Sequence, residues 1–341
     1  MQGIVFLGDR NFELRSFPDP APGIGEVVLQ MKASGICGTA LMLYRRPASA
    51  VGAPVIGGHE PCGVVAALGP GVDATRVRIG DRVMVHHYFG CTVCEHCRSG
   101  WAQLCQSTPV AVYGNNANGG HAPYLVVPAA TLIALPDELS FETGAAISCG
   151  SGTAYAALRR LNVSGHDTVA IFGQGPVGLA GTQFAKAFGA RVIALDVSPV
   201  RLARAAEFGA DVSIDPSSAD AVAEIMAATG GRGADAVLET SGATSAATAA
   251  VRAARIWGSV CLVSGQGPLD VNILADLVFR QITVFGSWTF SAAGQMECAR
   301  FVVERAVDVD RIFTHRWALS AASEAYRLTD SQAAGKGVFL M

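Results

Sequence analysis

The pattern of apolar and polar residues changes near residue 150. Before that point, short β-prone segments are separated by turn residues. The segment 25–32 alternates between apolar and polar positions, and 63–68 and 81–85 are further predicted strands. Alternation with a period of two is typical of strands that bury one face. We therefore expect a twisted, mainly antiparallel β-domain in the first 150 residues.

After residue 150, short continuous apolar runs alternate with helical stretches. Such runs are typical of parallel strands buried on both faces. The predicted strands are 168–172, 191–195, 212–214, 236–238, 258–263 and 282–285. The predicted helices are 177–188, 199–208, 219–229, 244–254 and 271–279. Six strands with helical crossovers predict an α/β fold with an open, doubly wound parallel sheet.

A chain of 341 residues is too long for one ordinary core, so we expect two domains. Residues 1–150 would form the β-rich domain, and 151–286 the doubly wound domain. The tail, 287–341, is predicted to be helical until a closing strand at 337–341, and we assign it to the first domain.

Charge and hydropathy exclude several classes of protein. The chain has 25 basic and 28 acidic residues, a net charge of −3, and no basic block. We therefore expect no nucleic-acid partner. No apolar run reaches the roughly 18 residues that span a membrane, and the N-terminus lacks the pattern of a secretory signal. We expect a cytoplasmic protein with no membrane partner.

Four cysteines lie within fifteen residues, at Cys91, Cys94, Cys97 and Cys105. In a reducing compartment clustered thiols are more often metal ligands than disulfides, and the odd total of nine cysteines also argues against full pairing. A disulfide bridge or free thiols are the alternatives. A ferredoxin-type cluster has a tighter last spacing followed by proline, whereas Gln106 follows here. We predict a structural zinc in a lobe at 88–108.

A glycine-rich loop follows the first predicted strand of the doubly wound domain. Gly173-Gln-Gly175-Pro-Val-Gly178 lies between this strand and a predicted helix, the context that a dinucleotide fingerprint requires. Gly173 would form the tight turn, Gly175 would let the pyrophosphate approach, and Gly178 would let helix and strand pack closely. Amides at the helix N-terminus would bind the phosphates.

Asp196 stands at the end of the second strand, eighteen residues after Gly178. A carboxylate there accepts hydrogen bonds from the adenosine ribose and repels a 2′-phosphate, which favours NAD over NADP. The alternative for Asp196 is a charge at a helix N-terminus. Arg201 would contact the ribose or soften this discrimination, or it would lie on a solvated helix face.

A second set of metal-ligand types is spread along the first domain. Cys37, His59 and Cys149 offer three ligands, and Glu60 is in reserve. Three protein ligands with an open fourth position are typical of a catalytic zinc. Taken singly, each cysteine would be read as a small buried hydrophobe and His59 as a turn residue.

Several motifs together resemble one family over essentially the full length of the chain. They are GICGT (35–39), GHEPCG (58–63), GDRV (80–83), the four-cysteine lobe, CGSGTAY (149–155) and GQGPVG (173–178). The chain resembles the medium-chain, zinc-dependent alcohol/polyol dehydrogenases. The resemblance implies a GroES-like catalytic domain and a Rossmann domain with the active-site cleft between them, two zinc ions per chain, and a homodimer or homotetramer.

The resemblance also implies individual roles. Cys37, His59 and Cys149 match the catalytic zinc ligands, and Glu60 matches a carboxylate that can enter the metal shell. Thr39 matches the hydroxyl residue that touches the substrate oxygen. The expected cofactor contacts are Thr153, which would pack against the nicotinamide, and Gly173, Gly175, Pro176, Val177, Gly178, Asp196, Arg201, Ser241, Val263, Gly265 and Ser287.

The chain departs from the family at two positions. Ala40 stands where an aspartate commonly supports the metal-binding histidine, so we expect another group to hold His59. Met42 stands where a histidine often ends the proton relay. The proton would then leave through water or the ribose hydroxyl, or by a rerouted relay.

The candidates for the substrate pocket are Met42, His87 and His121. His87 falls where relatives often place an aromatic side chain, and an imidazole there favours a hydroxylated or charged substrate. The alternative is a structural histidine at a strand end. His86 is expected on the surface or in a turn.

These features predict a zinc-dependent oxidoreductase that transfers a hydride between NAD and a secondary alcohol, polyol or sugar-like substrate. An NADPH-preferring carbonyl reductase of the same fold is a second hypothesis, and Asp196 argues against it. A scaffold that binds zinc without catalysis is a third. Only Ala40 and Met42 favour that reading.

Overall fold

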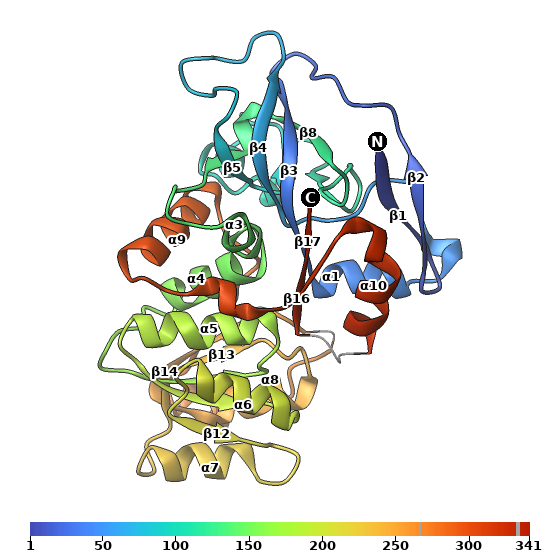
Figure 1. The fold of residues 1–341 in the computed structure, drawn as a ribbon. Coiled ribbons are helices and arrows are strands. Elements are labelled where there is room, and N and C mark those ends of the chain that lie inside the picture. Colours follow the sequence, from blue (N-terminus) through green and yellow to red (C-terminus); the bar gives the residue numbers. More distant parts are fainter. Residues whose placement is uncertain (266, 332–334) are drawn as a thin grey trace. The chain divides into compact units, whose positions relative to one another are not determined.

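The computed structural model describes residues 1–265, 267–331 and 335–341. The chain divides into two compact units, shown as a ribbon in Figure 1. The first unit contains 1–149 and 291–341, and the second contains 150–290. The first segment of the first unit ends one residue before the predicted end at 150, and its second segment begins four residues after the predicted start at 287.

The first unit is built on a seven-stranded sheet in the order β16-β17-β3-β4-β5-β9, with β8 paired to β3. All its pairs are antiparallel except β16 with β17. The strands are β3 (Glu26–Ile36), β4 (Pro61–Leu68), β5 (Arg82–Val85), β8 (Tyr124–Pro128), β9 (Leu132–Ala134), β16 (Phe313–Trp317) and β17 (Lys336–Leu340). Two strand pairs lie outside this sheet, β1 (Gln2–Gly8) with β2 (Asn11–Ser16), and β6 (Tyr88–Phe89) with β7 (Ala111–Val112).

The alternation predicted for this unit is visible only in part in β3. Val27, Leu29 and Met31 are buried in one apolar cluster and Gln30 is exposed, but Val28 and 33–36 are buried as well. The helices of this unit are α1 (Gly38–Arg45), α2 (Glu95–Arg98), α3 (Phe141–Ile147), α9 (Ala292–Glu304) and α10 (Ala322–Asp330). The start of α3 is capped by Ser140, whose hydroxyl accepts a hydrogen bond from the Thr143 N–H at 2.9 Å.

One strand of the tail was not predicted. The segment before the closing strand was expected to be helical, but β16 lies in the sheet and pairs in parallel with β17. Phe313 and Trp317 are buried at its two ends, while the polar residues between them give no continuous apolar run. This strand forms because β17 offers it a free edge, which is a tertiary rather than a local cause.

The second unit holds a six-stranded, wholly parallel sheet in the order β12-β11-β10-β13-β14-β15. In chain order this is 3-2-1-4-5-6, the doubly wound arrangement, and it confirms the predicted fold class. The strands are β10 (Thr168–Phe172), β11 (Arg191–Leu195), β12 (Val212–Ile214), β13 (Ala234–Glu239), β14 (Ala254–Leu262) and β15 (Thr283–Gly286).

Helices cross between these strands as the apolar pattern predicted. They are α5 (Pro176–Ala187), α6 (Pro199–Glu207), α7 (Ala221–Ala228), α8 (Thr244–Ala253) and a π-helical segment (Ile273–Val278). A further helix, α4 (Gly150–Arg160), precedes the first strand and was not predicted. Val169, Ala170 and Ile171 of β10 are fully buried, so both faces of the central strand are covered. Within the described ranges no helix combines the length and the apolarity needed to cross a bilayer.

Candidate active site and metal centres

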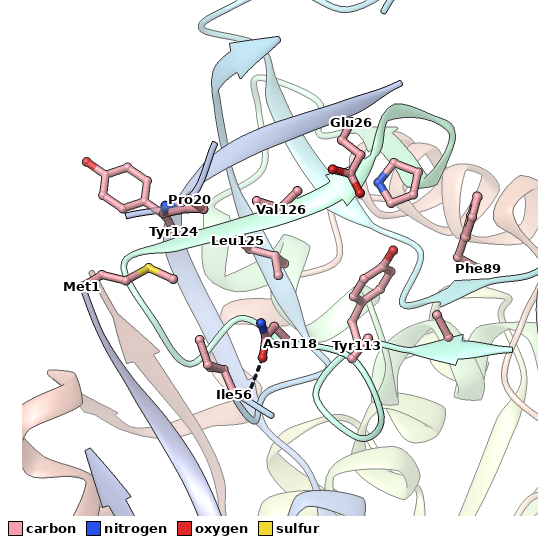
Figure 2. A pocket seen from close by; sticks show the side chains of 13 residues that line it. Met1, Pro20, Glu26, Ile56, Phe89, Tyr113, Asn118, Tyr124, Leu125 and Val126 are labelled. Carbon is pink, nitrogen blue, oxygen red and sulfur yellow. Dashed lines mark hydrogen bonds between the residues drawn. The ribbon is translucent and has the colours of Figure 1, made fainter. Parts of the chain in front are cut away.

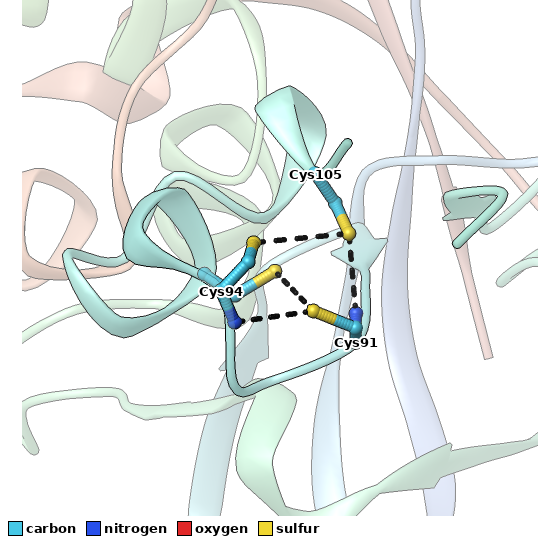
Figure 3. A group of neighbouring side chains, drawn as sticks. Cys91, Cys94 and Cys105 are labelled. Atoms are coloured by element: carbon cyan, nitrogen blue, oxygen red, sulfur yellow. Dashed lines mark hydrogen bonds between the residues drawn. The ribbon is translucent and has the colours of Figure 1, made fainter. Parts of the chain in front are cut away.

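The four clustered cysteines converge in the first unit, in the segment between β6 and β7 (Figure 3). The Sγ atoms of Cys91 and Cys97 are 3.9 Å apart, and those of Cys94 and Cys105 are 4.0 Å apart. A tetrahedral zinc with thiolates at about 2.3 Å has edges of about 3.8 Å, so the four sulfurs fit this ion. All nine cysteines of the chain are free thiols, which excludes the disulfide alternative in this structure.

Backbone amides already stabilise part of this lobe in its charged form. The Cys94 N–H points at the sulfur of Cys91 at 3.3 Å, and the Cys91 N–H at that of Cys105 at 3.4 Å. Donation from the Cys91 and Thr108 amides lowers the pKa of Cys105 to about 5. By contrast, burial raises the pKa of Cys97 to about 12, so a metal would have to displace that proton.

The second set of ligands also comes together, although its members are far apart in sequence. Cys37 follows β3, His59 and Glu60 precede β4, and Cys149 follows α3. The Sγ atoms of Cys37 and Cys149 are 3.7 Å apart, and the four residues have ligand atoms within 4.8 Å of one another. His59, Glu60 and Cys149 are buried and Cys37 is half-buried, and the sulfur separation again fits a tetrahedral zinc.

The electrostatics of this group favour a bound cation. Hydrogen bonding from Cys149 and the nearby His59 keep the pKa of the Cys37 thiol well below its usual value. Burial lowers the pKa of His59, but the Cys37 thiolate more than offsets this and raises it. Cys37 and His59 thus stabilise each other's charged forms, and a divalent ion could bind the sulfur and the imidazole directly instead.

A lysine that the sequence did not point to completes the group. Lys336 is 3% exposed, and its Nζ donates to both carboxylate oxygens of Glu60, which is fully buried. Burial raises the pKa of Glu60 to about 6, and Lys336 opposes this rise. No local signal distinguishes a lysine at the start of a C-terminal strand. Only the order of strands places it beside Glu60.

The glycine-rich loop of the second unit joins β10 to α5, which begins after Gly175. Gly173 has a φ of +85°, and a Cβ atom there would lie 2.8 Å from the Ser241 nitrogen. A Cβ atom on Gly178 would lie 1.8 Å from the Gly173 carbonyl oxygen. Both positions therefore need glycine, the first for its turn and the second for close packing of helix on strand.

Asp196 lies at the carboxyl end of β11 and is fixed over this loop. One carboxylate oxygen accepts the Gln174 N–H at 2.6 Å, and the other accepts the Ser198 N–H at 2.9 Å. The Arg201 guanidinium lies 3.7 Å from Asp196, which places the two predicted ribose contacts side by side.

The remaining predicted cofactor residues follow the same edge of the sheet. Ser241 follows β13, Val263 and Gly265 follow β14, and Ser287 follows β15. Pro176 and Val177 form the first turn of α5, and Thr153 is buried in α4. Because the strands are parallel, their carboxyl ends meet at one edge. The sequence did not point to Glu239, a buried carboxylate that accepts the Ser241 N–H at 2.8 Å and orders this edge.

Comparison with known proteins gives matches to both units. The model of the alcohol dehydrogenase GroES-like domain matches residues 23–137, and that of zinc-binding dehydrogenases matches 176–306. An uncharacterized zinc-type alcohol dehydrogenase-like protein, YphC of Escherichia coli K12, is 37% identical over 97% of this chain and 96% of its own. The chain belongs to the zinc-type alcohol dehydrogenase family.

Two further relatives also match over nearly the full length of the chain. The L-threonine 3-dehydrogenase of Pyrococcus horikoshii is 33% identical over 96% of this chain and 95% of its own. The solved alcohol dehydrogenase TADH from Thermus sp. ATN1 superposes with a TM-score of 0.92 at 28% identity, covering 100% of this chain and 99% of that one. The protein is thus an oxidoreductase of the alcohol dehydrogenase type, acting on CH–OH groups.

In this dehydrogenase, the two positions that depart from the family pattern lie on α1. Ala40 is 1% exposed and packs in an apolar cluster with Tyr44 and Tyr326, so no carboxylate occupies this space. Met42 is exposed. Thr39, in the first turn of the same helix and two residues from Cys37, is also exposed and can be reached by a substrate.

His87 lies beside the dehydrogenase's metal-ligating group, whereas His121 packs against Tyr326 and Phe339. The ring of His87 is centred 5.2 Å from that of His59, and its Nδ1 donates to the Ser148 carbonyl at 2.8 Å. Burial keeps the pKa of His87 well below its usual value, so the ring is neutral. His121 is fully buried, with Nδ1 2.8 Å from the Ser34 hydroxyl. His86 was expected on the surface or in a turn. The surface position is wrong, because His86 is 3% exposed and faces Gln295.

A separate cavity of about 360 Å³ lies in the first unit (Figure 2). The described residues that line it include neither the metal-ligating group nor the three pocket candidates. They are Met1, Pro20, Glu26, Ile56, Phe89, Ala111, Tyr113, Ala117, Asn118, Tyr124, Leu125, Val126 and Pro128. The cavity is therefore distinct from the candidate active site of the dehydrogenase.

Proposed function

We propose that this protein is an NAD-dependent, zinc-containing dehydrogenase that transfers a hydride between NAD and a secondary alcohol, polyol or sugar-like substrate. The observation that carries the proposal is the group of Cys37, His59 and Cys149, whose ligand atoms are close enough to share one ion. Three such ligands leave a fourth position for a substrate oxygen.

Separate residues of the chain would bind the metal, accept the proton and contact the substrate. Cys37, His59 and Cys149 would hold the zinc, which when bound supplies Lewis acidity that lowers the pKa of a substrate hydroxyl. Thr39, exposed beside the ligands, would accept the hydroxyl proton through a hydrogen bond and pass it to water, because Met42 cannot carry it further. His87, neutral and 5.2 Å from the His59 ring, favours a hydroxylated substrate over a plain aliphatic one.

The preference for NAD is supported by Asp196. Its carboxylate is held by two backbone amides and cannot easily turn away from a 2′-phosphate. Arg201 beside it would contact the ribose and neutralise part of this charge. An NADPH-preferring carbonyl reductase is disfavoured for the same reason. We propose two zinc ions per chain, because both groups of ligands fit the same ion.

We also propose a homodimer or homotetramer that uses the second unit. Strand β15 is an edge of its sheet, and exposed apolar side chains lie close by, Trp257 at 68% and Phe279 at 72% exposure. The Trp257 N–H donates to the Arg280 carbonyl, which places the segment of Trp257 next to the segment that carries Phe279. Nine free thiols suit the reducing cytoplasm, where we expect the protein to act.

The test combines metal analysis with an assay. We expect about two zinc ions per chain, and formation of NADH with a panel of secondary alcohols, polyols and sugars. Rates with NAD⁺ should exceed those with NADP⁺. One zinc per chain and no turnover with any substrate would favour the scaffold hypothesis, and a preference for NADPH with ketones would favour the reductase.

A further inference from the structure

Three adjacent strands bring Lys336 to the metal-ligating group. In the register of β17 with β3, Gly337 lies opposite Ile36, so Lys336 lies beside Cys37. In the register of β3 with β4, Ser34 lies opposite Pro61, so Glu60 lies beside Gly35. One end of the β17-β3-β4 sheet therefore carries an ammonium, a thiol and a carboxylate next to one another.

The backbone makes room for this contact. A Cβ atom on Gly35 would lie 1.8 Å from a Glu60 carboxylate oxygen, so the absence of a side chain there lets the carboxylate lie against β3. Lys336 and Glu60 are both almost fully buried. Within the described part of the chain, Lys336 is the cation that forms an ion pair with Glu60. The geometry of the Glu60 side chain thus depends on a residue 276 positions away.

A buried carboxylate cannot stay charged without a partner. Beside Glu60 two partners are available, the Lys336 ammonium and an ion bound by Cys37, His59 and Cys149, because a Glu60 oxygen lies within 4.8 Å of the other ligand atoms. If Lys336 holds the carboxylate, the fourth metal position stays open. If the Lys336 ammonium is removed, the metal ion is the one of these two partners that remains for the Glu60 carboxylate.

We propose that Lys336 is a positioning residue that keeps Glu60 out of the coordination shell and so keeps the fourth position of the metal site open. This rests on the proposed function for the presence of the metal, but not on any alcohol being a substrate. Without Lys336, Glu60 becomes the fourth ligand and the catalytic site closes, like the four-cysteine lobe.

The test uses the full-length protein loaded with Co²⁺, with imidazole as the probe, and without alcohol or nucleotide. Imidazole can bind only a metal with an open position, so the change in the Co²⁺ absorption spectrum reports the catalytic site and not the closed lobe. Lys336→Met should weaken imidazole binding about 10–100-fold while the cobalt content is retained. Lys336→Arg, which keeps the charge, should bind imidazole nearly as the wild type does.

The decisive control is the double variant Glu60→Gln/Lys336→Met, which removes both charges. It should regain imidazole binding, because an amide has no charge to neutralise and the pair is replaced as a unit. Wild-type imidazole binding by Lys336→Met would overturn the proposal. If Lys336→Met does not fold, the double variant decides, because a double variant that still excludes imidazole would show that Lys336 acts in another way.

If the wild-type protein takes up only one cobalt and shows no response to imidazole, the proposed function fails, and the role of Lys336, which needs the bound metal, fails with it. If the wild type takes up two and responds while Lys336→Met responds equally, the role of Lys336 fails and the proposed function stands. The two failures are therefore distinguishable in one set of spectra.

Discussion

The two groups of metal ligands in this protein are built in opposite ways. The lobe takes four sulfurs from fifteen consecutive residues, and all four cysteines are half-buried. The catalytic group takes its ligands from positions as far apart as Cys37 and Cys149, mixes sulfur, nitrogen and oxygen, and is buried except for the half-buried Cys37. Both fit a tetrahedral ion by their sulfur separations.

Under the proposed function, the difference shows how a chain would make a structural and a catalytic site from similar ligands. Four thiolates fill a tetrahedron, so the lobe leaves no position for a substrate. The catalytic group offers three ligands, and its fourth candidate ligand, Glu60, forms an ion pair with Lys336. On this proposal, closure of the lobe comes from local spacing, and openness of the catalytic group comes from an ion pair with a distant strand.

The largest expected effect is on turnover, from Cys37→Ala. Removing one of three ligands should abolish activity, by about 10³-fold or more, and lower the zinc content from two ions to one, because the remaining ligands cannot hold the ion in place. The melting temperature should change little. Zinc analysis, calorimetry and an NADH assay measure these three quantities.

Cys298→Ala is the matched control for this variant, since Cys298 is a fully buried thiol of the same unit that belongs to neither group. It should keep two zinc ions and its activity. Retained turnover in Cys37→Ala would remove this residue from the site.

Cys94→Ser should have the complementary effect, on stability. The lobe has little core of its own, so the metal supplies its folding free energy. We expect loss of one zinc and a melting temperature lower by about 5 °C. His96→Ala, in the same lobe but outside the ligand group, should change neither. An unchanged melting temperature and two bound zinc ions in Cys94→Ser would contradict the structural role.

Asp196→Ala extends the comparison to the cofactor loop, a third site that is local in sequence. Removing the carboxylate should narrow the preference for NAD over NADP by about tenfold, or roughly 1.4 kcal/mol. The ratio of kcat/KM values for the two cofactors measures this, and zinc content should stay at two. An unchanged ratio would refute contact with the ribose.

Thr92→Gly should have the smallest effect. Thr92 lies between two ligands of the lobe with a φ of +64°, a conformation that costs most residues energy but not glycine. The substitution should leave the zinc in place and change the free energy of unfolding by no more than about 1 kcal/mol. If it releases the zinc, the threonine side chain itself supports the lobe.

Some elements could be predicted from the sequence, and others could not. The continuous apolar run of β10 and its glycine loop were predicted at the correct positions, because each depends on neighbours in the chain. β16 was missed, because its pairing with β17 supplies what its own residues do not. His86 was misplaced for a related reason, since its burial comes from α9, 209 positions further along.

The sequence alone determined the two domains, the parallel sheet, the spacing of the four-cysteine lobe and the types of ligand in the catalytic group, because these are patterns of local spacing and apolar periodicity. The tertiary structure alone decided that Ala40 packs under Tyr326 and that Lys336 meets Glu60. Such contacts depend on strand order and register, and no spacing along the chain encodes which distant strand becomes a neighbour.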